Sequence, residues 1–133
     1  MTEQEALWEV VDIIHIVLVG ASVKSRLQVE DLPATGPELT LGCDMRCSHA
    51  GPGNPVEVRG TLVVEGKIAG ESEPCLQIEI EHRLLYSLPD DYILGEEALQ
   101  EFAWQNGIFN VWPYWREMVD SIYARMKLPL PTR

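Results

Sequence analysis

Apolar and polar residues alternate most regularly in the middle of the chain, over three stretches of about a dozen residues. Because side chains of a strand point to its two faces in turn, the alternation predicts strands at Glu38–Cys47, Val56–Lys67 and Leu76–Leu88. Short turns rich in Gly and Pro separate them and predict antiparallel pairing, with one buried and one polar face. The residues expected on the buried face are Leu39, Leu41, Cys43, Met45, Cys47, Val56, Val58, Leu62, Val64, Leu76, Ile78, Ile80, His82, Leu84 and Tyr86.

The beginning of the chain allows two interpretations. Thr2 and Glu5 have the spacing of a capping box, and apolar residues at helical spacing follow, which predicts a short helix over residues 2–14. From His15 to Leu27 the pattern becomes strand-like, with a first half that is apolar on both faces. Alternatively, the strand begins as early as Val10, because Val and Ile are frequent there. The residues expected on one face of this strand are Val17, Val19, Ala21 and Val23.

Two helices are predicted after the strands. Residues Glu96–Gln105 form a short one, and Gly107 is expected to break it from a longer one. The long helix is expected to start near residues 111–113, because Pro113 suits a first turn, and Pro129 stops it. Apolar residues along it recur at spacings of three and four and cover a wide face. They are Val111, Trp112, Tyr114, Trp115, Met118, Val119, Ile122, Tyr123 and Met126.

This order of elements predicts an α+β fold, a four-stranded antiparallel sheet with two C-terminal helices packed on one face. The 133 residues suffice for a single domain, residues 1–133, with its own core. The aromatic face of the long helix is wider than one sheet needs. It is interpreted either as a core helix or as a helix buried against both its sheet and a neighbouring subunit.

Charge excludes some classes of function. The net charge is −11, which argues against nucleic-acid binding because phosphate contacts need Lys and Arg. The N-terminus is acidic, unlike a secretory leader, and the longest apolar run, Ile13–Ala21, is too short to span a membrane. A cytoplasmic location is therefore expected.

Candidate chemistry is sparse. The three cysteines are an odd number and predict reduced thiols. Cys47 and His49, completed by Cys75 or His82, are candidate metal ligands, but burial of cysteine as a small hydrophobe is the favoured interpretation. The sequence has no glycine-rich phosphate loop, nucleophile elbow or paired-histidine motif. No enzymatic activity, cofactor or metal is expected.

The stretch Val111–Pro129 carries a specific motif. An aromatic-Pro-Tyr-x-Arg-Glu sequence opens the long helix, and an Arg is followed shortly by a Pro near its end. The residues are Trp112, Pro113, Tyr114, Trp115, Arg116, Glu117, Arg125 and Pro129. In this motif the chain resembles the SecB family of molecular chaperones. The motif covers about 20 residues, and the remaining chain is similar to the family in the order of its elements.

The resemblance implies an ATP-independent holdase that keeps unfolded polypeptides soluble in the cytoplasm, as a homotetramer or homodimer. Its partners would be precursor proteins for export, with the SecA motor, or an antitoxin of a toxin–antitoxin module. The client contacts it suggests are Leu32, Leu85, Tyr86, Trp104, Phe109 and Trp115. The acidic sheet positions suggested for a partner are Glu79 and Glu81. The residues suggested for the oligomer interface are Trp112, Tyr114, Met118 and Ile122.

Some positions depart from the export chaperones. Thr35 and Gly36 precede the Pro37-Glu38 pair, where those proteins have an aromatic client contact. Arg83 and Leu84 replace strand glycines, and the chain ends at Arg133, without the second C-terminal helix and acidic tail. These departures favour a narrower client range over coupling to SecA.

Two alternatives remain open from the residues. One is a small-ligand-binding α+β protein in which the sheet and the aromatic helix enclose a pocket. The other is an adaptor subunit of a larger complex.

Overall fold

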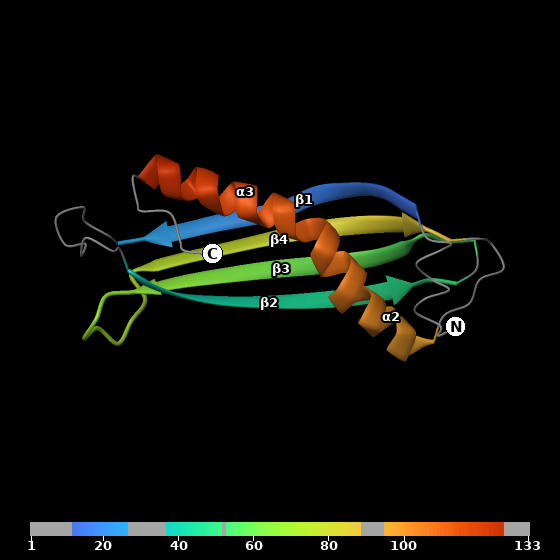
Figure 1. The fold of residues 1–133 in the computed structure, drawn as a ribbon, viewed down its shortest axis with the longest axis horizontal. Helices are drawn as coiled ribbons and strands as arrows, with labels where there is room; N and C mark the ends of the chain where they lie inside the picture. Colours follow the sequence, from blue (N-terminus) through green and yellow to red (C-terminus); the bar gives the residue numbers. More distant parts are fainter. Residues whose placement is uncertain (1–11, 27–36, 52, 89–94, 127–133) are drawn as a thin grey trace.

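The computed structural model describes residues 12–26, 37–51, 53–88 and 95–126, which form a four-stranded antiparallel sheet with a helix on one face (Figure 1). The strand order is β1-β4-β3-β2, so that β1 and β2 are the two edges of the sheet. The strands are β1 (Asp12–Ser25), β2 (Glu38–His49), β3 (Val56–Lys67) and β4 (Leu76–Ser87). The predicted α+β class with an antiparallel sheet is confirmed.

The strand bounds agree closely with the alternation. β3 has the predicted bounds, β2 continues to His49, and β4 ends at Ser87. β1 begins at Asp12, so the helix expected over residues 2–14 is wrong for its last three residues, and residues 2–11 lie outside the described ranges. Pairing of Asp12 and Ile13 with the end of β4 decides this region in favour of a strand.

The helical segments follow one another without interruption. They are α2 (Glu96–Phe102), the π-helical turn η2 (Ala103–Gly107) and α3 (Ile108–Met126). The expected break at Gly107 is therefore wrong, as is the expected start near residues 111–113, since Pro113 lies inside α3. Pro113 removes one backbone hydrogen bond, but the carbonyl that loses its donor belongs to Phe109, which solvent reaches. None of the described helices has the length and apolar character to cross a membrane.

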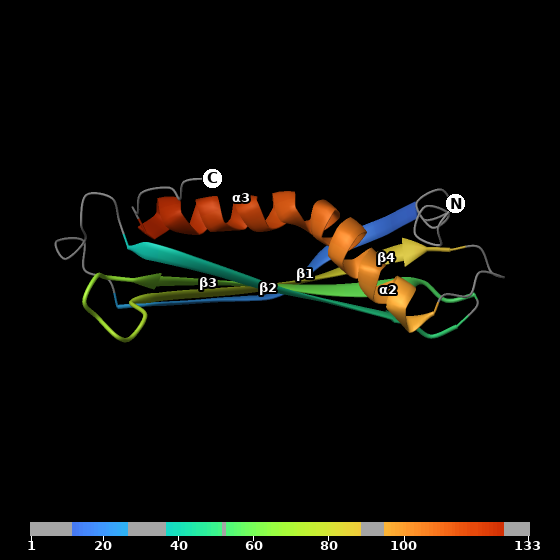
Figure 2. The same cartoon turned by 60° about the horizontal axis from the view of Figure 1, so that its bottom comes forward.

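Gly107 serves close packing. A Cβ atom built on it would lie 2.9 Å from Cγ1 of Val58 and 3.0 Å from Cε of Met45. The absence of a side chain therefore lets η2 approach the sheet where α2 passes into α3. Figure 2 shows the whole helical stretch on one side of the sheet.

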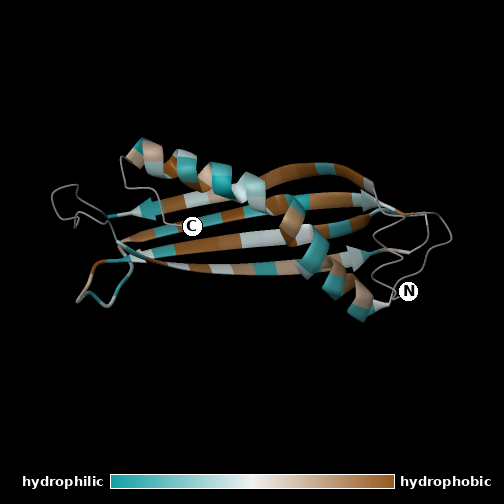
Figure 3. Cartoon of the chain, viewed as in Figure 1, coloured by the Kyte–Doolittle hydropathy of each residue, from teal (hydrophilic) through white to brown (hydrophobic). Residues whose placement is uncertain are grey.

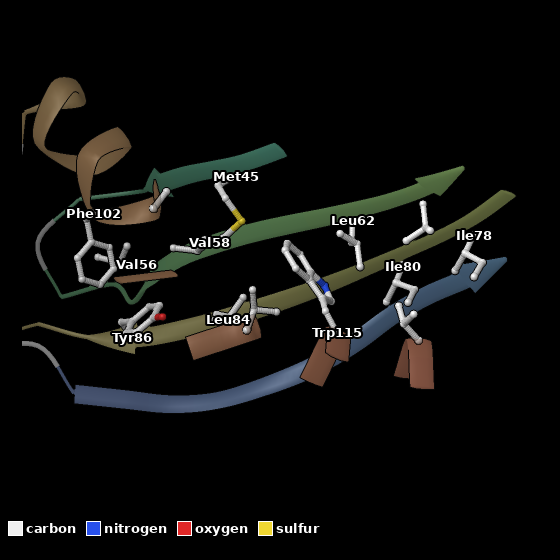
Figure 4. Packing of buried hydrophobic residues seen from close by; sticks show 14 of the residues in the cluster. Met45, Val56, Val58, Leu62, Ile78, Ile80, Leu84, Tyr86, Phe102 and Trp115 are labelled. Carbon is white, nitrogen blue, oxygen red and sulfur yellow. The ribbon is translucent and has the colours of Figure 1, made fainter. Parts of the chain in front are cut away.

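The core lies between the sheet and the helix (Figure 4). Every second residue of β3 and β4 is buried, as the alternation predicted, and the helix contributes one stripe of side chains at a spacing of four. That stripe is Val111, Trp115, Val119 and Tyr123. The wide apolar face expected for the helix is therefore only partly covered, and Trp112 remains exposed.

Strand β1 does not keep one face throughout. Its register with β4 shifts between Ile13 and His15 and again between Leu18 and Gly20. As a result, Val17 is opposite the outward residue Arg83, whereas Ala21 and Val23 are opposite the buried residues Ile80 and Ile78. The expectation of Val17, Val19, Ala21 and Val23 on a single face is wrong, because each irregularity changes the side to which the following residues point.

Candidate functional site

Large aromatic side chains on the helix are open to solvent. The exposed fraction is 72% for Phe109, 42% for Trp104, 43% for Trp112 and 45% for Tyr114. They come from η2 and the first two turns of α3, where the buried stripe contributes only Val111 and Trp115. This end of the helix thus exposes more aromatic surface than the sheet covers, and such a surface commonly marks an interaction site.

Trp115 holds this end of the helix against the sheet. Its indole is fully buried, and the ring of Trp112 lies edge-on to it with centroids 6.2 Å apart. Tyr114 contacts the sheet residue His82, with ring centroids 6.0 Å apart. Two of the exposed rings, those of Trp112 and Tyr114, therefore rest on buried rings, which restricts their positions.

Several polar atoms are buried beneath the helix. Among the described residues, His82 Nδ1, Trp115 Nε1 and the hydroxyls of Tyr86 and Tyr123 have no hydrogen-bond partner. Burial lowers the pKa of His82, because it disfavours the charged imidazolium. Burial also raises the pKa of Tyr123 to about 12. The interface between sheet and helix thus favours neutral side chains.

Strand β1 is a second apolar surface. α3 packs against β3 and β4, and β1 leaves six large apolar side chains exposed. They are Ile13, Ile14, Val17, Leu18, Val19 and Val23. Because of the register shifts they lie on both faces of an edge strand, and the apolar character of β1 is visible in Figure 3.

The outer sheet face carries charges of both signs. Arg59 donates to Glu57 at 2.7 Å and to Glu81 at 3.0 Å. Arg59 is also opposite Arg46 on β2 and Arg83 on β4, so three arginines form a row across the sheet. This face is therefore not a uniformly acidic surface, although both predicted acidic residues, Glu79 and Glu81, point to it.

One hollow among the described residues differs from the aromatic-lined pocket that a small-ligand-binding function would use. A shallow hollow of about 100 Å³ lies over β1, β3 and β4, and its lining contains no aromatic residue. The lining residues are Ser22, Lys24, Val63, Gln77, Ile78 and Glu79.

The described residues do not assemble the metal site considered for Cys47 and His49. They contain no group of three or more His, Cys, Asp or Glu side chains arranged to hold a metal ion. Burial raises the pKa of Cys47 to about 12, in keeping with a cysteine packed as a small hydrophobic side chain.

Comparison with solved structures identifies the architecture. The Mycobacterium tuberculosis Rv1957 SecB-like chaperone, solved in complex with a ChAD peptide from the Rv1956 HigA1 antitoxin, superposes with a TM-score of 0.73. The alignment covers 98% of this chain and 93% of that one, at 21% identity. The chain has a SecB-like fold.

A protein of unknown function from Streptococcus agalactiae also matches, with a TM-score of 0.52 and 10% identity over 92% of this chain and 95% of that one. No family model matches the sequence, and neither does any curated protein.

Within this SecB-like fold the expected client contacts separate into two groups. Trp104 and Phe109 are exposed, whereas Leu85, Tyr86 and Trp115 are buried at 9% exposure or less. Leu85 lies on the outer face of β4, but its side chain is buried there. Direct client contact by Tyr86 or Trp115 would require the helix to move away from the sheet. Leu32 lies outside the described residues.

The residues expected at an oligomer interface are accessible. Trp112 and Tyr114 are exposed, and Met118 and Ile122 are partly buried further along α3. Sequence reasoning missed β1 as an exposed surface. The signal is its run of apolar residues on both faces, which predicts a strand covered on both sides, whereas the described residues leave these side chains exposed.

Proposed function

We propose that the chain is a molecular chaperone, an ATP-independent holdase that binds unfolded or unstable polypeptides through exposed apolar side chains. The observation that supports this most is the group of exposed aromatic residues on the helix of a SecB-like fold. Unfolded chains expose apolar segments of no fixed sequence, and a row of aromatic rings contacts such segments without requiring a particular shape.

Trp104 and Phe109 are the proposed client contacts. They lie on either side of Gly107, at which the helix packs tightly against Val58 and Met45 of the sheet. The net charge of −11 would keep a complex with an apolar client in solution. Because binding alone is needed, the proposal requires no catalytic residue, cofactor or metal, and we place the activity in the cytoplasm.

An antitoxin is the client class that we favour over precursor proteins for export. The structural neighbour was solved with an antitoxin peptide, and the row of Arg46, Arg59 and Arg83 crosses the face on which Glu79 and Glu81 would meet a basic motor protein such as SecA. Like charges on that face disfavour a basic partner.

We further propose that the chain acts as a homodimer or homotetramer. The exposed apolar residues of β1 and the helix residues Trp112, Tyr114, Met118 and Ile122 would be covered by other copies. β1, 14 residues long, is also an edge strand of the sheet formed by the described residues, so that a second copy can extend the sheet there.

The test is an aggregation assay. A chemically unfolded enzyme diluted into buffer without ATP is expected to aggregate more slowly with an equimolar amount of the protein. The same delay with added ATP would support the holdase mechanism. An unchanged aggregation rate at tenfold excess of the protein would refute the proposal.

A further inference from the structure

The π-helical turn η2 determines which residues of the helical stretch face the sheet. In an uninterrupted α-helix, residues seven apart point within about 20° of each other. Trp104 would therefore face the sheet together with Val111, seven residues later. In the structure Val111 is buried, but Trp104 is exposed, and Ala103 is the buried residue instead. The burial pattern before the turn is thus shifted by one residue, which places a small side chain against the sheet and a large one in solvent.

One hydrogen bond explains the shift. The backbone N–H of Ile108 donates to the carbonyl oxygen of Ala103, five residues earlier, whereas an α-helix bonds residues four apart. Trp104 and Phe109 are also five residues apart, and at about 100° per residue an α-helix would turn them about 140° away from each other. Because the turn takes up one extra residue, it brings the two exposed rings onto the same side of the helix. The helix axis bends at the same place (Figure 1).

Contacts with the sheet hold η2 in this arrangement. Gly107 packs so closely that a Cβ atom on it would lie 2.9 Å from Cγ1 of Val58. Asn106 is buried, and among the five residues of η2 only Trp104 and Gln105 are exposed. Without the turn, the indole of Trp104 would have to fit beside Gly107, where a single methyl group already meets the sheet.

We propose that η2 builds the client contact: it turns Trp104 out of the core and sets it beside Phe109, so that the two rings together bind one apolar segment of the client. The proposal rests on the proposed chaperone function and specifies how the fold produces its binding surface. Ala103, Asn106 and Gly107 are positioning residues, because they face the sheet and act through the two aromatic side chains.

The exposed area of the two rings suits a client better than a second copy. With about 200 Å² for a Phe and about 250 Å² for a Trp side chain, exposures of 72% and 42% leave roughly 250 Å² of aromatic surface. A stable subunit interface buries roughly 800 Å² on each partner. A short apolar segment of an unfolded chain, with one or two large side chains, covers a surface of the smaller size. The two rings are therefore assigned to the client rather than to the oligomer interface.

An engineered histidine pair tests the alignment in the full chain. Two histidines one turn apart on the same side of a helix can chelate a transition-metal ion. In Trp104→His/Phe109→His we expect Ni²⁺ to bind at least about 100-fold more tightly than in either single variant, because the second ligand is then held close to the first. Arg116→His/Ser121→His is the matched control, with the same spacing at exposed positions of α3, and it should show no such gain. Titration calorimetry measures binding, and circular dichroism verifies the fold.

Relocation of the tryptophan tests whether the two rings work together. Trp104→Gln should lose most of the delay of aggregation of a chemically unfolded enzyme. Trp104→Gln/Ser121→Trp restores an exposed tryptophan on α3, three turns beyond Phe109 and about 120° around the axis. We expect it to hold the client no better than Trp104→Gln alone, because the new ring lies away from Phe109.

The outcomes separate this proposal from the proposed function. A delay restored by the relocated tryptophan would overturn the proposal and leave the chaperone function standing. So would a histidine pair at Trp104 and Phe109 that binds Ni²⁺ no more tightly than the single variants. Absence of any delay with the parent chain would overturn the chaperone function, and the proposed use of the two rings with it.

Discussion

Trp115 and Gly60 approach each other so closely that any side chain at the strand position would displace its neighbours. A Cβ atom on Gly60 would lie 3.0 Å from Cζ2 of Trp115, and it would also lie 2.9 Å from Sδ of Met45. The indole thus occupies the space above the centre of β3, and α3 is held against the sheet at the level of its exposed aromatic residues. This contact links the core to the proposed client surface.

Gly60→Ala is expected to destabilise the protein by about 1–3 kcal/mol, the usual range for overpacking a core. Either Trp115 or Met45 must shift to admit the methyl group. Urea unfolding followed by tryptophan fluorescence measures the change. Gly42→Ala is the matched control, because a Cβ there meets nothing within 4 Å, and it should change stability by no more than about 0.5 kcal/mol. Equal effects of the two substitutions would contradict this role of the contact.

Phe109→Ser is expected to weaken client holding with little effect on folding. The side chain is 72% exposed, so its removal should change the free energy of unfolding by no more than about 0.5 kcal/mol. The delay of client aggregation should shorten at equal protein concentration. Arg116→Ala, an exposed polar position on the same helix, should leave the delay unchanged. If both variants hold clients like the parent chain, Phe109 is not a client contact.

Trp112→Ser is expected to shift the assembly to smaller species. Trp112 is the exposed partner of the buried Trp115, and a hydroxyl in its place removes apolar surface from the proposed interface. Sedimentation velocity across a range of concentrations would show the change, with circular dichroism to verify the fold. Glu117→Ala on the same helix serves as control. An unaltered mass for Trp112→Ser would place the interface elsewhere, with β1 as the next surface to test.

Stability is expected to fall as the pH drops below about 6.5. Burial lowers the folded-state pKa of His82 from the ordinary value of 6.5, so the unfolded chain binds more protons than the folded one just below that pH. The stability that the folded chain gains from a neutral His82 is complete above pH 6.5, and it is lost progressively as the pH falls to the folded-state pKa. The groups that face His82 are Leu18 on β1, Gly60 on β3 and the phenol of Tyr114 on α3.

Urea unfolding at several pH values from 7.5 to 5.0 checks this expectation. His82→Gln should reduce the slope of stability against pH over this interval, because it removes the buried titrating group. His15→Gln, at an exposed position of β1, should retain the slope of the parent chain. A slope for His82→Gln identical to that of the parent would show that other groups cause the pH dependence.

The sequence predicted β3 and β4 well because both strands bury one face only. At Leu62 and Ile80, for example, burial follows parity. On β2 the expected burial is wrong for Leu41 and Cys43, which are exposed, and Met45 is the one fully buried residue of that strand.

The prediction for β1 was wrong because apolar residues occupy both its odd and its even positions. The bulges near Ile14 and Val19 also depend on pairing with β4, which no local pattern encodes. The prediction for the helix was wrong at Gly107. A glycine in a sequence commonly indicates a helix break, but here its missing side chain lets the helix pack against Val58.

The candidate site was only partly accessible to sequence reasoning. The aromatic residues of the helix were identified, but Trp112 and Trp115 both belong to the apolar pattern, and only packing against Gly60 decides which is buried. Nothing in the sequence indicated that the side-chain amide of Gln100 on α2 hydrogen-bonds to the backbone of Met45 and Cys47 on β2, because these bonds depend on the distance between the two elements.

The most direct test of the chaperone proposal is light scattering on a sizing column, with the protein alone and after mixing with a chemically unfolded client. We expect a dimer or tetramer alone, and a larger soluble species containing both chains after mixing. A monomer that elutes unchanged while the client precipitates would contradict the proposal. The SecB-like fold would then serve another activity.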